Sequence, residues 1–94
     1  MPMKLEWDEH KNRANIRRHR IDFADVHPLF DGPMFVTLDT RRDYGEDRLI
    51  GIGLLHDAMV VVVFVEKTED TIRIISARKA ERHERERFKE EIGH

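Results

Sequence analysis

The sequence contains no cysteine, which excludes both a disulfide framework and a thiolate zinc site. Small secreted domains usually depend on such cross-links, and Met1 to Lys4 include no apolar stretch of the kind found in a signal peptide. The longest apolar run, residues 58–65, is far too short to cross a membrane as a helix. We therefore expect a cytoplasmic protein that does not associate with a membrane.

The chain also lacks internal repeats, linkers and low-complexity segments. Its 94 residues are enough for one domain, so we expect a single domain over residues 1–94. Hydrophobic residues make up 39% and charged residues 38% of the chain, which is typical of a globular protein rather than a disordered one. A chain this short buries only roughly 60–65% of its unfolded surface, so its stability is expected to be modest.

No strong excess of either charge is present, since the net charge is −2, but the charges are unevenly distributed. Residues 1–20 carry six basic side chains against three acidic ones, and residues 73–94 carry seven against five. Residues 21–72 carry four basic side chains against eleven acidic ones. The basic ends could bind RNA or an acidic partner, or could simply be solvated surface.

The first third of the chain predicts a short edge strand and two helices. The strand covers Lys4–Trp7, and Asp8 is placed to cap a helix over Glu9–His19 whose apolar stripe is thin. Asp22 is placed to cap a second helix, which Pro28 must kink or end. The apolar residues expected on its buried side are Phe23, Val26, Leu29 and Phe30.

The rest of the chain predicts four strands and a charged helix. The strands cover residues 34–39, 48–55, 59–65 and 71–77, and the helix covers residues 80–92. The third of these strands should bury Val61 and Val63 on one face and Val62 and Phe64 on the other. Gly51 and Gly53 indicate a bulge or a close approach of another backbone. The order predicts an α+β fold with an antiparallel sheet of about four strands, one face covered by helices and one free to bind.

Several motifs spread along the chain resemble the BrnT family of toxins. They are Glu6-Trp7-Asp8, Lys11-Asn12, Asn15, His19, Ile21-Asp22-Phe23, Phe30-Asp31, Pro33, Gly45-Glu46-Asp47-Arg48, Ile52-Gly53, the run Ile72 to Ala80, and Glu84. Each motif is weak alone, but their order from residue 6 to residue 84 is hard to obtain by chance. The family often has glycine at the position of Arg20.

The resemblance implies a RelE/ParE-like toxin of a type II toxin–antitoxin system that cleaves RNA and slows growth. It implies a BrnA-like antitoxin partner of the ribbon-helix-helix class, in a heterotetramer that represses its own operon. DNA would then be bound only through the antitoxin. No cofactor is implied.

RNA can be cleaved without a metal ion by its own 2′-hydroxyl, given a base, an acid and cations around the phosphorane. Arginine suits the last task because its planar fork matches phosphate oxygens. We therefore predict Arg78 first, helped by Arg73 and Lys79, as catalytic groups. Strict alternation would place Arg73 and Arg78 on opposite faces unless a bulge intervenes or the strand ends near Ser76. Either arginine could instead pair with an acid of the middle segment.

Four further side chains have both a functional and a structural interpretation. Arg48 could contact a phosphate or pair with Glu46 and Asp47, and Glu66 could be a base or a solvated strand end. His19 could be a proton shuttle or a helix-dipole contact, and His56 is a weaker candidate.

The residues predicted to bind RNA are Trp7, Lys11 and Arg18; Trp7 could be a core anchor, a stacking platform or both.

A metal site is not predicted. There is no His-Glu-x-x-His motif, and His83 and His94 lie near a chain end that is expected to fray. Two other functions remain open at this point. One is a catalytically weak binding module that acts as an antitoxin-bound co-repressor, because no acid–base pair is obvious. The other is direct DNA binding, which the absence of a helix-turn-helix pattern and the negative net charge disfavour.

Overall fold

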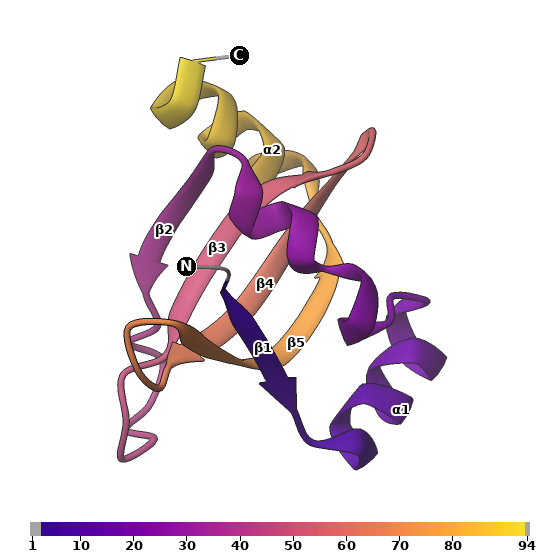
Figure 1. The fold of residues 1–94 in the computed structure, drawn as a ribbon. Helices are drawn as coiled ribbons and strands as arrows, with labels where there is room; N and C mark the ends of the chain where they lie inside the picture. Colours follow the sequence, from indigo (N-terminus) through magenta and orange to yellow (C-terminus); the bar gives the residue numbers. More distant parts are fainter. Residues whose placement is uncertain (1–2, 94) are drawn as a thin grey trace.

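The computed structural model describes residues 3–93, and His94 lies outside the described residues. The elements in chain order are β1 (Lys4–Trp7), α1 (Glu9–His19), the 3-10 turns η1 (Phe23–Asp25) and η2 (His27–Asp31), β2 (Met34–Leu38), β3 (Leu49–Leu55), β4 (Ala58–Glu66), β5 (Thr71–Lys79), α2 (Arg82–Phe88) and the π-helical turn η3 (Lys89–Gly93). Figure 1 shows them arranged around one twisted sheet. The ends of β1 and α1 agree with the prediction, and the other strands differ from it by a residue or two.

The sheet is mixed, with the strand order β1-β5-β4-β3-β2. The four later strands pair antiparallel, as the run of hairpins predicts, but β1 pairs parallel with β5, with Lys4 opposite Thr71. The prediction of an antiparallel sheet is therefore wrong at this edge. Hairpin patterns concern strands that are adjacent in the chain, and nothing local sets the direction of a strand that pairs across most of the sequence.

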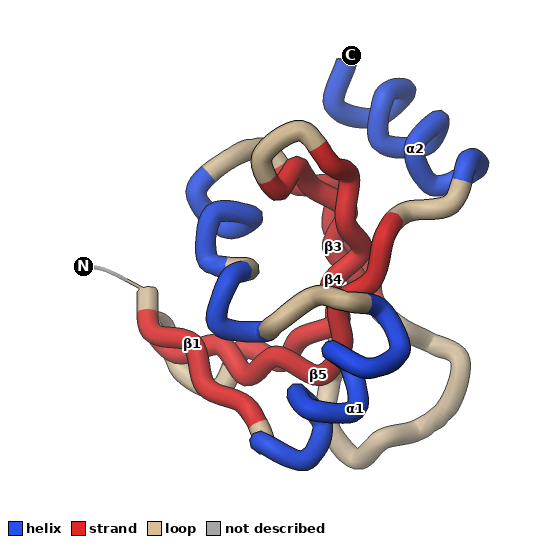
Figure 2. The backbone as a smooth tube through the Cα atoms, turned by 90° about the vertical axis from the view of Figure 1, so that its right-hand side faces the viewer, coloured by secondary structure: helices blue, strands red, loops and turns tan. Residues whose placement is uncertain are grey.

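Both faces of the sheet are covered, which corrects the expectation that one face stays free. On the first face, η1 and η2 pack fully buried Phe23 and Leu29 against Ile74. On the second face, α2 packs Phe88 against Val61. Figure 2 shows α2 and the 3-10 turns on opposite sides of the strands. The C-terminal helix begins two residues later than predicted, at Arg82, and continues beyond Phe88 as η3, in which Ile92 is exposed.

The central strand β4 is buried on both faces, as its apolar run predicts. Val61 and Val63 lie toward the second face, Val62 and Phe64 lie toward the first, and none of the four is more than 8% exposed. Strict hydrophobicity on both faces is the pattern expected of a strand in the middle of a sheet. This prediction is confirmed.

The first helix follows its predicted cap, but the second helix does not form. The Asp8 carboxylate accepts hydrogen bonds from the backbone N–H groups of His10 and Lys11, which lowers the pKa of Asp8. Asp22 also caps as predicted, yet it opens only η1, and a second 3-10 turn with Pro28 in its first turn follows. Pro28 lacks the N–H that a continuing α-helix needs, so the backbone tightens instead. No helix among residues 3–93 is long and apolar enough to span a membrane.

The predicted close approach at Gly51 is made by side chains, not by another backbone. A Cβ atom on Gly51 would collide with the Met34 side chain and would lie 3.3 Å from the Phe64 ring. The bulge that the two glycines suggested in β3 is absent from that described strand, whose pairing with both neighbours is regular. It lies in β5.

Candidate functional site

A β-bulge interrupts the pairing of β5 with β4. Ser76 pairs with Val63, whereas Ile74 pairs with the next residue of β4, Phe64. Ile75 is therefore the extra residue, and every residue after it is shifted by one relative to strict alternation.

The bulge places Arg73 and Arg78 on the same face of the sheet. Arg73 lies opposite Val65 and Arg78 lies opposite Val61, and these two valines share the second face. Of the two arrangements that the sequence left open, the bulge is the one found, since β5 continues to Lys79. The two arginines are separated by four positions of β4, roughly 13 Å along the strand, and they line different clefts.

Arg78 is held by Glu84 of α2. Its Nη1 and Nη2 atoms donate to the two carboxylate oxygens at 2.8 and 2.7 Å, and Nη1 also donates to the Lys79 carbonyl oxygen at 3.3 Å. This end-on pairing leaves Nε–H and one Nη2–H, which form the side-on fork of the guanidinium. The carboxylate raises the pKa of Arg78, and the arginine lowers the pKa of Glu84. Arg78 is thus an oriented cation that retains one fork.

Arg73 is paired less tightly. Its Nε donates to the Glu6 carboxylate at 3.0 Å, and both side chains are nearly half exposed. The alternative of salt bridges to the middle segment is wrong in its partners for both arginines, because Glu6 and Glu84 come from the two ends of the chain. Strand β1 and helix α2 flank β5, so their acids are nearer than those of the acidic middle.

His19, the last residue of α1, shares a cleft with Arg78. Its pKa is lowered, first by partial burial and then by the positive charges of Arg18 and Arg78. The ring is therefore largely uncharged at neutral pH and can accept a proton. A protonated contact with the helix dipole, the alternative interpretation, is not favoured by a lowered pKa.

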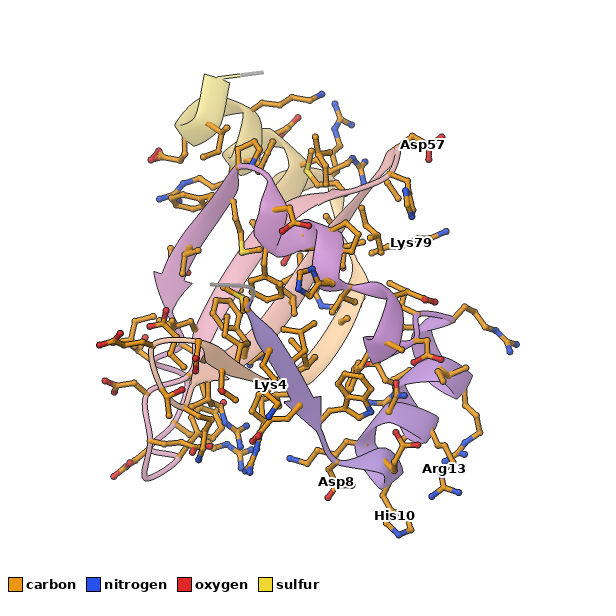
Figure 3. The ribbon with its side chains drawn as sticks, viewed as in Figure 1. Lys4, Asp8, His10, Arg13, Asp57 and Lys79 are labelled. Atoms are coloured by element: carbon orange, nitrogen blue, oxygen red, sulfur yellow. The ribbon has the colours of Figure 1, made fainter. Side chains whose placement is uncertain are left out.

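Lys79 projects from the end of β5. It lies opposite Val60, on the other side of the strand from Arg78, and Figure 3 shows its side chain extending into solvent. The two residues nevertheless line the same cleft, because it lies at the end of the strand.

Three clefts adjoin along the edge of β5. The first, the α1–β5 cleft, has a volume of about 590 Å³ and is lined by Lys11, Ala14, Asn15, Arg17, Arg18, His19, Ile75 and Ser76. The second, the Trp7–Arg48 cleft, has a volume of about 520 Å³ and is lined by Glu6, Trp7, Asp8, Lys11, Glu46, Arg48, Arg73, Ile74 and Ile75. The third, the Arg78 cleft, has a volume of about 470 Å³ and is lined by Arg18, His19, Arg78, Lys79 and Glu81.

Shared residues join these clefts into one surface, which we call the β5 groove. Lys11 and Ile75 line both the first and the second cleft, and Arg18 and His19 line both the first and the third. All eight side chains predicted for catalysis or RNA binding line this groove. Glu66 is exposed at the end of β4 and does not line it, and neither do the other described histidines.

Two buried asparagines fix α1 against the rest of the fold, and sequence reasoning gave them no role. The Asn15 amide donates to the carbonyl oxygens of Ala77 and Ile21 at 2.8 and 3.0 Å and accepts from the Ala77 N–H at 3.1 Å. Asn12 accepts from the Phe23 N–H at 2.8 Å. Asparagine is a poor residue for a helix interior, so two of them three positions apart were the available signal.

Asp39 organises the connection between β2 and β3, and the sequence analysis also missed it. Its side chain is fully buried, and it accepts hydrogen bonds from Nε and Nη2 of Arg41, both at 2.8 Å. The Arg41 guanidinium holds the pKa of Asp39 well below its usual range. The buried carboxylate thereby holds Arg41 just beyond the end of β2.

Arg48 is stacked on Tyr44, with its guanidinium carbon 4.1 Å from the ring centroid. The predicted alternative, pairing with a neighbouring acid, is met only loosely, since Nε lies 3.7 Å from the Glu46 carboxylate. The Nε atom is buried and has no hydrogen-bond partner within the described part of the chain. Stacking therefore fixes the side chain without using up its donors.

Trp7 packs against the core, which is one of the two roles considered from the sequence; its role as a stacking platform for a base stays a prediction. Its ring packs edge-on against Phe23 with the centroids 6.4 Å apart, and Nε1 donates to Glu9 at 2.6 Å. The residue also lines the Trp7–Arg48 cleft, so it anchors the core and presents part of its surface to the groove.

One group of side chains among the described residues has the composition and spacing of a metal site: Glu81, His83 and Glu84. Glu81 and Glu84 already form the capping box of α2, and Glu84 also holds Arg78. These carboxylates are committed to the helix and to the arginine, so we assign no metal-dependent step to them.

Comparison with known proteins identifies the family. Residues 7–84 match the family model described as the ribonuclease toxin BrnT of a type II toxin–antitoxin system. The chain belongs to the BrnT family. The crystal structure of the Brucella abortus ribonuclease toxin BrnT is similar to this BrnT-family chain, with 32% identity, a TM-score of 0.65, and coverage of 85% of this chain and 99% of that one. No curated protein matches the chain. The range matched by the BrnT model includes every residue of the β5 groove except Glu6.

Proposed function

We propose that this chain, as the toxin of its pair, cleaves RNA in the β5 groove without a metal ion. The observation that carries this proposal is the juxtaposition of Arg78 and His19. Glu84 orients the Arg78 guanidinium and leaves its side-on fork for a phosphate, while His19, in the same cleft, has a lowered pKa and so can take a proton at neutral pH.

In the proposed reaction the RNA is its own nucleophile. His19 accepts the proton of the 2′-hydroxyl, and the 2′-oxygen attacks the adjacent phosphorus. Arg78 stabilises the negative charge of the phosphorane, with Lys79 adding positive charge at the mouth of the cleft. The bond from phosphorus to the 5′-oxygen breaks, and that oxygen takes a proton from solvent. The products are a 2′,3′-cyclic phosphate and a 5′-hydroxyl.

The remaining basic residues of the groove hold the strand. Lys11 and Arg18 line the α1–β5 cleft, where they can neutralise successive phosphates. Binding that depends on such contacts weakens steeply as salt rises, because counterions released from the RNA must be taken back.

The decisive test compares an RNA with the same strand carrying 2′-deoxyribose at the cleaved position. We expect cleavage of the first only, with a 2′,3′-cyclic phosphate end, and no change when a chelator is added. Equal cleavage of both strands would rule out attack by the 2′-hydroxyl, and loss of activity with chelator would rule out metal independence.

We further propose that the partner is a ribbon-helix-helix antitoxin, bound in a heterotetramer that contacts DNA through the antitoxin alone. The support is the family resemblance together with a negative net charge, which disfavours direct contact with DNA. Co-expression with the product of the adjacent gene should give a complex whose mass, measured by light scattering, equals that of a heterotetramer. The complex should also melt at a higher temperature than the toxin alone. Absence of a complex at micromolar concentration would contradict this.

A catalytically weak co-repressor is the second candidate, and the Arg78–Glu84 contact favours it. Glu84 already occupies the end-on fork of Arg78, so an incoming phosphate must use the other fork or displace a carboxylate. A toxin that binds its antitoxin and represses the operon, but yields no cyclic phosphate from any RNA, would establish this function instead.

A further inference from the structure

The two larger clefts of the β5 groove differ in charge. The α1–β5 cleft is lined by three permanently charged bases, Lys11, Arg17 and Arg18, and by no acid. The Trp7–Arg48 cleft combines three bases with three acids: Lys11, Arg48 and Arg73 with Glu6, Asp8 and Glu46. A phosphate is attracted to the first composition but not to the second, which is close to neutral.

We propose that the Trp7–Arg48 cleft is a nucleobase subsite of the same RNA site and that it prefers guanine. The inference rests on the proposed function, since it assigns this cleft to a base of the RNA whose backbone lies in the α1–β5 cleft. A near-neutral cleft with many hydrogen-bonding groups and an aromatic side chain in its wall, Trp7, suits a base.

Of the three carboxylates of this cleft, Glu46 is the one that accepts no hydrogen bond through either oxygen within the described residues. Glu6 accepts from Arg73, and Asp8 accepts from the N-terminus of α1. Glu46 approaches Arg48 only to 3.7 Å, which is beyond hydrogen-bond distance, and its side chain is 32% exposed. A ligand that donates two hydrogen bonds to one carboxylate therefore fits at Glu46.

Guanine is the base with that combination of groups. Its N1–H and N2–H are adjacent donors that match the two oxygens of a carboxylate, and its O6 and N7 atoms accept from arginine. Arg73 donates to Glu6 through Nε, and its Nη groups remain to serve the acceptors. Adenine, cytosine and uracil each lack the pair of adjacent donors.

The shared residues connect the base subsite with the rest of the site. Lys11 and Ile75 line both clefts, so a nucleotide whose phosphate contacts Lys11 can place its base beyond the bulge. The two clefts can then hold the phosphate and the base of the same nucleotide.

The test uses binding, so it does not depend on cleavage. Fluorescence anisotropy would compare two uridine oligonucleotides that carry 2′-deoxyribose throughout and differ in one residue, guanine in one and hypoxanthine in the other. Hypoxanthine lacks only the N2 amino group. We expect the guanine strand to bind about tenfold more tightly, and Glu46→Gln to remove most of that difference. The matched control is Glu69→Gln, which removes the same charge at an exposed position outside the groove and should keep the difference.

Equal binding of the two strands by the wild-type protein would overturn the proposal, and so would a preference that Glu46→Gln leaves unchanged. Cleavage of RNA without guanine discrimination would reject the subsite alone. Guanine discrimination without cleavage would retain the subsite and reject the proposed catalytic function.

Discussion

Asn15 takes the place of a neighbouring strand at Ala77. Strand β1 pairs with β5 only as far as Ile74, and beyond that point the Asn15 amide both donates to and accepts from the backbone of Ala77. Ala77 immediately precedes Arg78, and Asn15 lies one helical turn before His19. A single side chain therefore sets the position of the proposed base relative to the proposed phosphate ligand.

Replacing Asn15 with alanine should destabilise the protein by about 2–3 kcal/mol, because buried backbone groups of Ala77 lose their partner. The measurement is urea denaturation, with an unchanged dependence on denaturant. Arg13→Ala is the control, since Arg13 projects outward from α1 in Figure 3 and its loss should cost less than about 0.5 kcal/mol. Equal midpoints for the two variants would contradict the role of Asn15.

Arg78→Ala should lower the cleavage rate by ~10²–10³ while leaving antitoxin binding nearly intact. Arg78→Lys should restore only part of the activity, because a point charge cannot reproduce the side-on fork. Single-turnover cleavage and growth arrest both report on this. Arg82→Ala is the matched control, since its side chain is 85% exposed and lines none of the three clefts. Full activity in Arg78→Ala would leave that arginine a structural role only.

The proposed base predicts a pH dependence with a defined sign. The cleavage rate should rise with pH through the pKa of His19, below its usual value near 6.5, and level off above it, because the neutral ring is the active form. The charged groups around the ring are Arg18, Arg78, Lys79 and Glu81. Arg18→Gln should shift the midpoint of a His19 NMR titration upward by removing a repulsive charge. An unchanged midpoint would show that the charge of Arg18 does not lower the pKa of His19.

Arg20→Gly should stabilise the protein by about 0.5–1 kcal/mol. Arg20 ends α1 with φ 62° and ψ 29°, a left-handed conformation that strains a residue with a Cβ atom. Thermal denaturation measures the effect. The same replacement inside the helix, Arg13→Gly, should cost about 1 kcal/mol, so opposite signs are expected from one chemical change. Destabilisation by Arg20→Gly would mean that its side chain contributes more than the strain it causes.

The parts of the fold that depend on residues close together in the sequence could be predicted. Asp8 defined the start of α1, and the apolar run of β4 defined a strand buried on both faces. The failures concern interactions between distant segments. The parallel pairing of Lys4 with Thr71, and the packing of Phe88 on the second face, have no local signal. Pro28 is an intermediate case. The sequence predicted a helix that Pro28 kinks or ends, and the structure has two 3-10 turns in its place.

The candidate site was predictable in its residue types but not in its geometry. Arginine, lysine and histidine were recognised as suited to phosphate chemistry, and the fold gathers all eight chosen side chains along one groove. The partners Glu6 and Glu84 could not be assigned, because each arginine had acids at several sequence distances. Asn15 and Asp39 were missed because only its hydrogen-bond partners mark a polar side chain as buried. For Asn15 that partner, Ala77, is distant in sequence. For Asp39 the partner, Arg41, is close in sequence, but nothing in the sequence indicates that the carboxylate is buried.

The bulge in β5 predicts how this strand would respond to a change of length. Deleting Ile75 would make Ser76 follow Ile74 and would leave every pairing with β4 as it is, so Arg73 and Arg78 would still share a face. Such a deletion would remove only the residue that lies between two clefts of the groove. Relatives whose two arginines are four rather than five positions apart can therefore be aligned as equivalents, and the gap belongs at Ile75.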